Sequence, residues 1–225
     1  KLFQEDREGC LLILLDTHAS MHFGTRVRFK SVQAARAAAA AAWYAVRAGE
    51  RVGVMAFGHA DQLLRPQAGP RGALAVCGAL AEWDAQPVSA RVEPLSDALA
   101  RAGRVLHGAS RVLLVSDGFS CDAAARQRLL DLGRHAGISV LAVADALERA
   151  LPPPGRYPLE HAGERFEVLL QSERQRGDFQ RALGAGAARL VELAQSLGLR
   201  CSSIDTAADA FEAVSGLLGV RKAAR

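Results

Sequence analysis

The chain has 225 residues, a formal net charge of +4 and a hydrophobic fraction of 50%. This length and composition indicate one large globular domain with a sizeable core, and they exclude a disordered chain. No apolar run reaches the roughly 18–20 residues that a membrane-spanning helix needs. The basic balance would permit nucleic-acid binding, but the arginines are spread along predicted helix faces with few aromatic residues between them. We therefore predict no nucleic-acid partner.

Short apolar runs alternate along the chain with longer stretches of helical periodicity. The runs predict strands at residues 10–15, 51–57, 62–65, 111–116, 138–144 and 199–204, with 62–65 a short edge strand. The periodic stretches predict helices at residues 30–48, 70–83, 95–107, 122–135, 173–197 and 207–218. Strands that alternate with helices indicate an α/β fold, with a doubly wound, mainly parallel sheet flanked by helices.

One break in composition interrupts this alternation, the Pro-rich segment at residues 151–155. A hairpin-like stretch follows it, with extended segments at 157–160 and 166–171 and a turn at Ala162-Gly163. We interpret residues 151–172 as a Pro-rich link and hairpin-like insertion within a single domain that covers residues 1–225. In the alanine-rich helix 30–48, we expect close packing on the sheet, anchored by Trp43 and Val46.

The cysteines lie far apart, with no Cys-x-x-Cys spacing: Cys10, Cys77, Cys121 and Cys201. This pattern indicates scattered reduced thiols in a cytoplasmic protein, and argues against a disulfide framework or a metal cluster. The chain begins at Lys1 without a methionine or a signal-like segment, so we interpret it as a fragment of a longer protein.

Two predicted strands are each followed by an acid, Asp16 and Asp117. In a parallel sheet these strand ends share one edge, where open α/β sheets bind their ligands. Two carboxylates with the hydroxyls of Ser20 and Ser116 would suit a hard cation such as Mg²⁺. An aspartate after a strand also often accepts hydrogen bonds from loop amides, so the residues alone leave both interpretations open.

His18, between Asp16 and Ser20, likewise has two interpretations. As a ligand, its imidazole would shift the preference toward Zn²⁺ or Mn²⁺. The alternative, which we favour, is a loop histidine at the surface. A hydrolase constellation of Asp16, Ser20 and His22 lacks a Gly-x-Ser-x-Gly context. Cys121 stands at a predicted helix start, but no histidine is tied to it by sequence, so we expect a buried or inert thiol.

The segment Asp16-Thr17-His18-Ala19-Ser20 resembles the Asp-x-Ser-x-Ser signature of von Willebrand factor A-type domains, with His18 in place of the first serine. Further segments extend the resemblance: DRE at 6–8, FGTRVRFKS at 23–31, AGERVGVMAFG at 48–58, Ser116-Asp117, and the stretch from Leu147 to Tyr157. In this order and spacing they are similar to the bacterial von Willebrand factor A-like family catalogued as domain of unknown function fifty-eight. Members usually carry an upstream Gly-Asp…Ile-Asp-Trp segment that is absent here.

The resemblance implies a Rossmann-like, von Willebrand factor A-type fold that covers essentially the whole chain. It also implies a cytoplasmic or membrane-associated protein that works beside MoxR-type AAA+ ATPases in the assembly, maturation or metal loading of other proteins. In A-type domains the cation is held by two loop serines, a threonine from a second loop and an aspartate after the fourth strand, and a partner's acid completes the shell.

Carried over residue by residue, Asp16 and Ser20 match the first loop of that site and Asp117 the third. His18 replaces the first serine, and Glu93 falls near the place of the threonine. Glu93 would then coordinate the cation directly, or its charge would replace the cation. The resemblance therefore implies a degenerate site for Mg²⁺ or Mn²⁺.

We therefore predict a non-enzymatic protein-interaction module whose partner surface is the edge that carries Asp16, His18, Ser20, Glu93 and Asp117. The alternative is a divalent-cation-dependent adhesion switch, in which the cation recruits an acidic partner group. A third class, a hydrolase, would require turnover that depends on Asp16.

Overall fold

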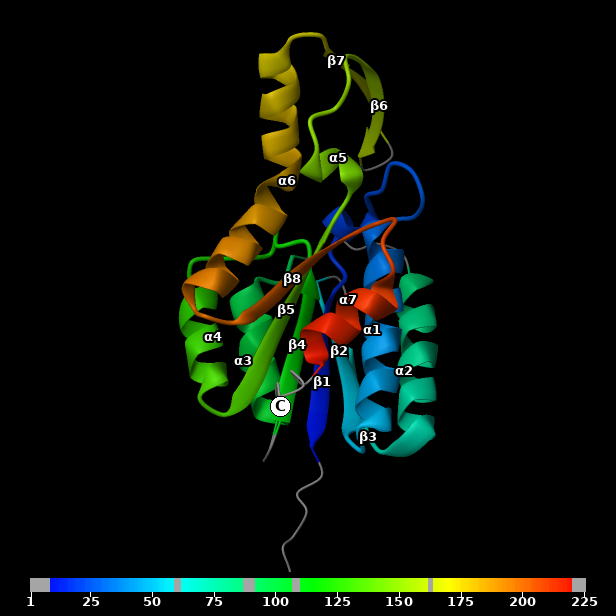
Figure 1. Ribbon diagram of the computed structural model, residues 1–225, viewed down its shortest axis with the longest axis vertical. Coiled ribbons are helices and arrows are strands. Elements are labelled where there is room, and N and C mark those ends of the chain that lie inside the picture. Colours follow the sequence, from blue (N-terminus) through cyan, green and yellow to red (C-terminus); the bar gives the residue numbers. More distant parts are fainter. Residues whose placement is uncertain (1–8, 59–61, 87–91, 107–109, 162–163, 220–225) are drawn as a thin grey trace, which may run out of the picture.

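The computed structural model describes residues 9–58, 62–86, 92–106, 110–161 and 164–219. Its central sheet has six strands in the order β3-β2-β1-β4-β5-β8. The strands are β1 (Cys10–Asp16), β2 (Arg51–Phe57), β3 (Leu63–Gln67), β4 (Ser110–Ser116), β5 (Ala136–Ala144) and β8 (Arg200–Asp205). All neighbours run parallel except β2 and β3, which are antiparallel. The predicted doubly wound, mainly parallel sheet is therefore confirmed (Figure 1).

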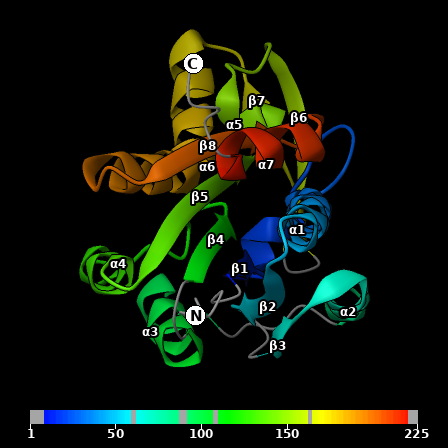
Figure 2. The same cartoon turned by 60° about the horizontal axis from the view of Figure 1, so that its bottom comes forward.

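Helices cover both faces of this sheet. They are α1 (Lys30–Arg47), α2 (Gly69–Asp84), α3 (Leu95–Val105), α4 (Ala125–Gly133), α6 (Glu173–Ser196) and α7 (Ala210–Leu218). One core joins Leu11 and Ile13 of β1 to α1, α2 and α7, and a second joins Leu12 and Leu14 to α3, α4 and α6. Figure 2 shows α1 and α2 on the opposite side of the sheet from α3 and α4. A strand buried on both faces must be apolar at successive positions, which explains the continuous run in β1.

The alanine stripe of α1 brings this helix close to the sheet. Its fully buried alanines are Ala34, Ala37, Ala38, Ala41, Ala42 and Ala45. Trp43 is 37% exposed, so the expectation that it anchors α1 is wrong. A helix that approaches through methyl groups leaves no room for an indole on that face. Val46 does pack against this core, as expected.

Several element boundaries differ from the predicted ones. Two four-residue helices, η1 (Ala19–His22) and α5 (Ala146–Arg149), were not predicted. Helix α7 begins at Ala210 because the Asp209 side chain caps it by accepting hydrogen bonds from the first amides. The predicted helix end at 107 and the predicted turn at Ala162-Gly163 lie outside the described residues.

The predicted hairpin forms a separate two-stranded antiparallel sheet, β6 (Gly155–His161) and β7 (Glu164–Leu170). It packs on α6 through Tyr157 and Phe179, whose ring centroids are 6.1 Å apart. Ser172 caps α6 in a capping box with Gln175. Together the hairpin and the N-terminal part of α6 project beyond the end of the central sheet (Figure 1).

Two glycines let the middle of α6 contact the loops at that end of the sheet. A Cβ on Gly186 would lie 2.6 Å from the Asp117 carbonyl oxygen, and one on Gly184 would lie 2.6 Å from that of Glu148. Carbon atoms cannot approach oxygen so closely without moving the helix. The lack of a Cβ at these two glycines therefore lets α6 lie against the β4–α4 loop at Gly186 and against α5 at Gly184.

We expect Gly186→Ala to destabilise the fold by about 1–3 kcal/mol, because the added methyl group overlaps the β4–α4 loop. The matched control is Gly216→Ala in α7, where an added Cβ would meet no atom within 4 Å and the position is exposed. This control should stabilise the protein by about 0.5–1 kcal/mol, since alanine favours a helix over glycine. Urea unfolding measures both variants. Equal stability of Gly186→Ala and the wild type would contradict the packing described here.

Candidate functional site

The ends of β1 and β4 bring Asp16, Ser116 and Asp117 together. The two strands are neighbours, and their register pairs Leu15 with Val115, so Asp16 lies beside Ser116. Both carboxylates are buried, each with 1% exposure. The carboxyl-terminal edge of the parallel sheet thus holds the acids that the sequence places there.

The Asp16 carboxylate accepts hydrogen bonds at both oxygens from its own chain. Oδ1 accepts from the His18 amide at 3.0 Å and lies 2.7 Å from His18 Nδ1. Oδ2 accepts from the hydroxyls of Ser116 at 2.5 Å and Ser120 at 3.2 Å. Sequence reasoning missed Ser120, which becomes a partner only when the loop after β4 folds back. Asp16 thus organises the two loops around it.

His18 is buried, with 7% exposure, so the expectation of a surface loop histidine is wrong. Its Nε2 accepts a hydrogen bond from the Glu93 amide at 3.2 Å, so that nitrogen carries no proton. Nδ1 is then the protonated nitrogen that donates to Asp16. The ring also meets Phe57 edge-on at 5.8 Å. With both nitrogens engaged, the imidazole has no lone pair left for a metal.

Lys30 supplies a positive charge inside the site. The residue is 1% exposed, and its Nζ donates to Asp117 Oδ2 at 2.9 Å and to Glu148 Oε1 at 2.6 Å. Lys30 Nζ also lies over the rings of Phe23 and Phe119, 5.6 Å from each ring centroid. Sequence reasoning read this lysine only as the start of a helix. A lysine at the first position of a helix is unfavourable, because its charge opposes the helix dipole. This unfavourable position could have indicated from the sequence that Lys30 has a partner elsewhere in the fold.

Burial and neighbouring opposite charges shift the pKa values of Lys30, Asp117 and Glu148 in opposite directions. Burial lowers the pKa of Lys30, but the charges of Asp117 and Glu148 raise it above its ordinary value, so the ammonium stays protonated. Burial also raises the pKa of both carboxyl groups, with Asp16 adding to the effect on Asp117, while Lys30 opposes the rise in each. The ammonium thus offsets the cost of two buried acids.

Glu93 is held by a second internal ion pair. Its carboxylate, in a residue with 6% exposure, accepts from Arg101 Nε at 2.8 Å and from Arg101 Nη2 at 2.9 Å. The Gly58 amide donates to the same carboxylate at 3.3 Å. This pairing argues against the prediction that Glu93 coordinates a cation or replaces it, which stays a prediction. A bidentate guanidinium already neutralises this carboxylate.

The residues present do not fit a divalent cation. Asp16 and His18 bind each other, Asp117 binds Lys30, and Glu93 binds Arg101. Ser20 Oγ is buried and has no hydrogen-bond partner among the described residues. One free hydroxyl is far short of the octahedral oxygen shell that Mg²⁺ needs. In the described part of the chain, no three His, Cys, Asp or Glu side chains are grouped to hold a metal.

The catalytic constellation considered from the sequence is not assembled. The buried atoms Ser20 Oγ and His22 Nδ1 make no hydrogen bond to any described residue, and Asp16 is paired with His18 instead of His22. Cys121 is buried, and burial raises the pKa of its thiol to about 12. Such a thiol is protonated and unreactive at neutral pH, as expected.

Above the buried pairs, four apolar side chains are exposed on the loops of the same edge. Val27 and Phe29 precede α1, Val92 precedes Glu93, and Phe119 follows Asp117. Their exposed fractions are 56%, 50%, 74% and 43%, in that order. We call these four residues the apolar rim. The loops above the buried pairs therefore expose apolar side chains, while the acids of the predicted site are paired inside the fold.

We expect Lys30→Met to destabilise the protein by about 3–5 kcal/mol at neutral pH, because two buried carboxylates lose their counter-charge. Both carboxyl groups already have raised pKa values, which removal of Lys30 raises further. An acid whose pKa is raised by folding stabilises the protein below its unfolded pKa of about 4, and this gain is lost as the pH rises through the folded-state pKa. The deficit should therefore be smaller at pH 5 than at pH 8.

Urea unfolding at both pH values measures this deficit. The control is the triple variant Lys30→Met, Asp117→Asn, Glu148→Gln, which removes all three charges and should recover most of the lost stability. A deficit that does not change between pH 5 and pH 8 would argue against the buried ion pairs.

We expect millimolar Mg²⁺ or Mn²⁺ to leave the thermal unfolding midpoint of the protein where it is in EDTA. A cation present at 100 times its dissociation constant would stabilise the fold by roughly 2.7 kcal/mol, a shift of several degrees. The control variant is Asp16→Asn. A cation-specific rise in the wild type that disappears in Asp16→Asn would show that the site binds metal after all.

Comparison with known proteins agrees with this fold. No curated protein matches the chain. BatB from Bacteroides thetaiotaomicron is 15% identical with a TM-score of 0.58, and an aerotolerance-related membrane protein from Bacteroides fragilis is 14% identical with a TM-score of 0.60. For both, the match covers 93% of this chain and 96% of theirs. The manganese-loaded TRAP protein of Plasmodium vivax is 15% identical with a TM-score of 0.52, over 92% of this chain and 71% of its own.

At these identities the structures establish likeness of fold alone. The sequence profile of the family described as "Protein of unknown function DUF58" matches residues 1–189, most of the chain. This protein therefore belongs to the DUF58 family.

Proposed function

We propose that this chain is a non-enzymatic protein-interaction module that binds a partner protein at the carboxyl-terminal edge of its sheet without a divalent cation. The observation that carries the proposal is Lys30, which neutralises Asp117 and Glu148 from inside the fold. Asp16 and Glu93 are likewise satisfied by the chain's own donors. The acids of the predicted site are therefore not free to hold a bridging metal, so a partner would meet the apolar rim.

The proposed division of roles refines the predicted partner-binding set. Four of the predicted residues are buried and would stabilise the loops from the interior: Asp16, His18, Glu93 and Asp117. The apolar rim on those loops provides the contact area. Exposed apolar side chains gathered at one edge are typical of protein-interaction surfaces.

The proposed partner is a MoxR-type AAA+ ATPase, and the proposed role is to assist the assembly or maturation of other proteins. Both follow from the resemblance to the family. We also propose a cytoplasmic location, which the free thiols of Cys10, Cys77, Cys121 and Cys201 support, because thiols persist in reducing compartments. Among the described residues, no helix is long and apolar enough to cross a membrane.

One observation favours the alternative, a cation-dependent adhesion switch. Ser20 Oγ is buried and has no hydrogen-bond partner among the described residues, as a vacant metal ligand would be. The TRAP structure, which shares the fold, is manganese-loaded. For this chain to bind a metal in the same way, Lys30 and His18 would both have to give up their present partners.

We expect Val27→Asp and Val92→Asp each to weaken binding to a purified MoxR-type ATPase at least tenfold, because a charge would have to be buried at the contact. The matched control is Leu74→Asp on α2, a similarly exposed apolar residue with 59% exposure that lies away from this edge. Biolayer interferometry with immobilised protein measures the three affinities. Rim variants that bind as well as Leu74→Asp would place the contact elsewhere.

The same assay run in EDTA distinguishes the two functions. Unchanged affinity in EDTA supports metal-free docking. Loss of binding in EDTA, with recovery on addition of Mn²⁺, would overturn it in favour of the adhesion switch.

A further inference from the structure

The two edges of the central sheet differ in how they are protected. At one edge, β3 is antiparallel, contains Pro66 and shifts register against β2 between Val52 and Val54. Proline and irregular register are devices that stop an edge strand from pairing with another chain. At the other edge, β8 pairs with β5 in unbroken register from Arg200 to Asp205. Its centre, Cys201-Ser202-Ser203, has no proline and no charge.

The outer side of β8 is unpaired in the part of the chain that the structure describes. Helix α6 packs on one face of this strand, where Cys201 joins the core, and α7 packs on the other, at Ile204. No described strand follows β8 in the sheet. A row of backbone amides and carbonyls therefore faces outward between two helices, available to another extended chain.

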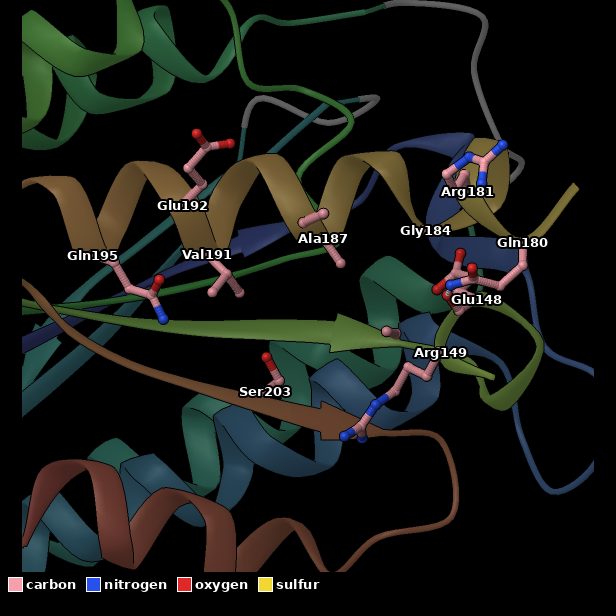
Figure 3. Close-up of a pocket in the computed structure, with 12 residues that line it drawn as sticks. Glu148, Arg149, Gln180, Arg181, Gly184, Ala187, Val191, Glu192, Gln195 and Ser203 are labelled. Carbon is pink, nitrogen blue, oxygen red and sulfur yellow. Dashed lines mark hydrogen bonds between the residues drawn. The ribbon is translucent and has the colours of Figure 1, made fainter. Parts of the chain in front are cut away.

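A groove of about 480 Å³ runs between α6 and this open strand (Figure 3). Its floor includes Ala144 at the end of β5. In Figure 3, Ala187 and Val191 point from α6 into the groove, and Ser203 points into it from β8. The volume lies within the roughly 300–1,000 Å³ of sites that hold ligands. Small side chains on both walls leave space for the side chains of an added strand.

The lining of the groove carries charges of both signs, Glu148 and Glu192 together with Arg149 and Arg181. Figure 3 shows Gln195 at one end and Arg149 at the other, near the carboxyl end of β8. Arg149 pairs with Asp205 at 3.4 Å, and its side chain remains 48% exposed. Such a surface pair contributes little, so the guanidinium can accept a stronger carboxylate partner.

We propose that this groove binds an extended peptide segment of a partner protein, which adds to β8 as a further strand. The segment would place small or β-branched apolar side chains against Ala187 and Val191, and an acidic residue beside Arg149. Because β8 has 6 residues, pairing along it spans about 20 Å. Backbone hydrogen bonds would provide affinity and the groove would select side chains, as in other cases of strand addition. The groove is separate from the apolar rim, so this proposal goes beyond the proposed function.

The test begins with a phage-displayed library of random twelve-residue peptides, selected on the wild-type protein. The strongest binder is then synthesised with a fluorescein label, and its affinity is measured by fluorescence anisotropy. We expect at least a tenfold loss for Ala187→Trp, which fills the groove. The matched control is Ala182→Trp, on an exposed position of α6 outside the groove, and it should bind as the wild type does.

A second variant covers the case in which Ala187→Trp does not fold. Ser203→Lys lies on an exposed position of β8, where a lysine blocks strand addition without entering the core. It should lose binding to the same extent. Arg149→Gln should weaken binding of an acidic peptide several-fold and leave its alanine-substituted analogue unchanged.

Hydrogen exchange locates the contact. We expect the bound peptide to slow exchange of the β8 amides. Failure to select any peptide, equal affinity for both the groove variants and the wild type, or protection confined to other strands would each overturn the proposal. Sedimentation analysis covers one more outcome: a wild-type dimer that becomes a monomer in Ser203→Lys would show that a second copy of this chain occupies the edge, and would also overturn it.

Discussion

The buried ammonium of Lys30 is the interaction on which the functional edge of this protein depends. It joins three segments that are distant in sequence: the start of α1, the loop after β4 at Asp117, and α5 at Glu148. A single cation between two carboxylates, all almost completely buried, is stable only while the three stay together, because removal of one partner leaves an uncompensated charge. The loops that carry the apolar rim are thus built on a polar interior.

Another buried acid, Asp145, fixes the loop that carries Val27 and Phe29. Asp145 is fully buried and accepts hydrogen bonds from the Thr25 amide at 3.1 Å, the Thr25 hydroxyl at 2.5 Å and the Thr206 hydroxyl at 2.9 Å. Burial raises the pKa of this carboxyl, but these hydrogen bonds outweigh burial and hold the pKa below its ordinary value. Asp145 also caps α5, the helix that presents Glu148 to Lys30. Lys30 and Asp145 therefore act on one connected set of loops.

Helix α6 borders both proposed surfaces. Through Gly186 it rests on the loop that carries Phe119 of the apolar rim, and through the next residue, Ala187, it lines the groove beside β8. Its position is set by backbone contact, because glycine allows the helix axis to approach the loop closely. A partner bound at either surface would therefore contact, or lie next to, the same rigid element.

The sequence by itself determined the strands, most of the helices and the meeting of Asp16 with Asp117 at one edge of the sheet. These are consequences of local pattern: an apolar run marks a buried strand, and parallel strands end at the same edge. Element ends were less accurate where a cap decided them, as at Asp209.

Only the tertiary structure decided which side chains are paired at the site. Lys30 meets Asp117 and Glu148 across 87 and 118 positions of the chain, and His18 meets the Glu93 amide across 75. No periodicity encodes such partners, and an isolated lysine or histidine is usually exposed, so local reasoning placed His18 at the surface and overlooked Lys30. Strand order and loop packing bring these groups together, and burial then requires each charge or polar atom to find a partner. That requirement acts only in the folded chain, and the internal pairs that it produces favour the proposed metal-free partner surface over the alternative cation site.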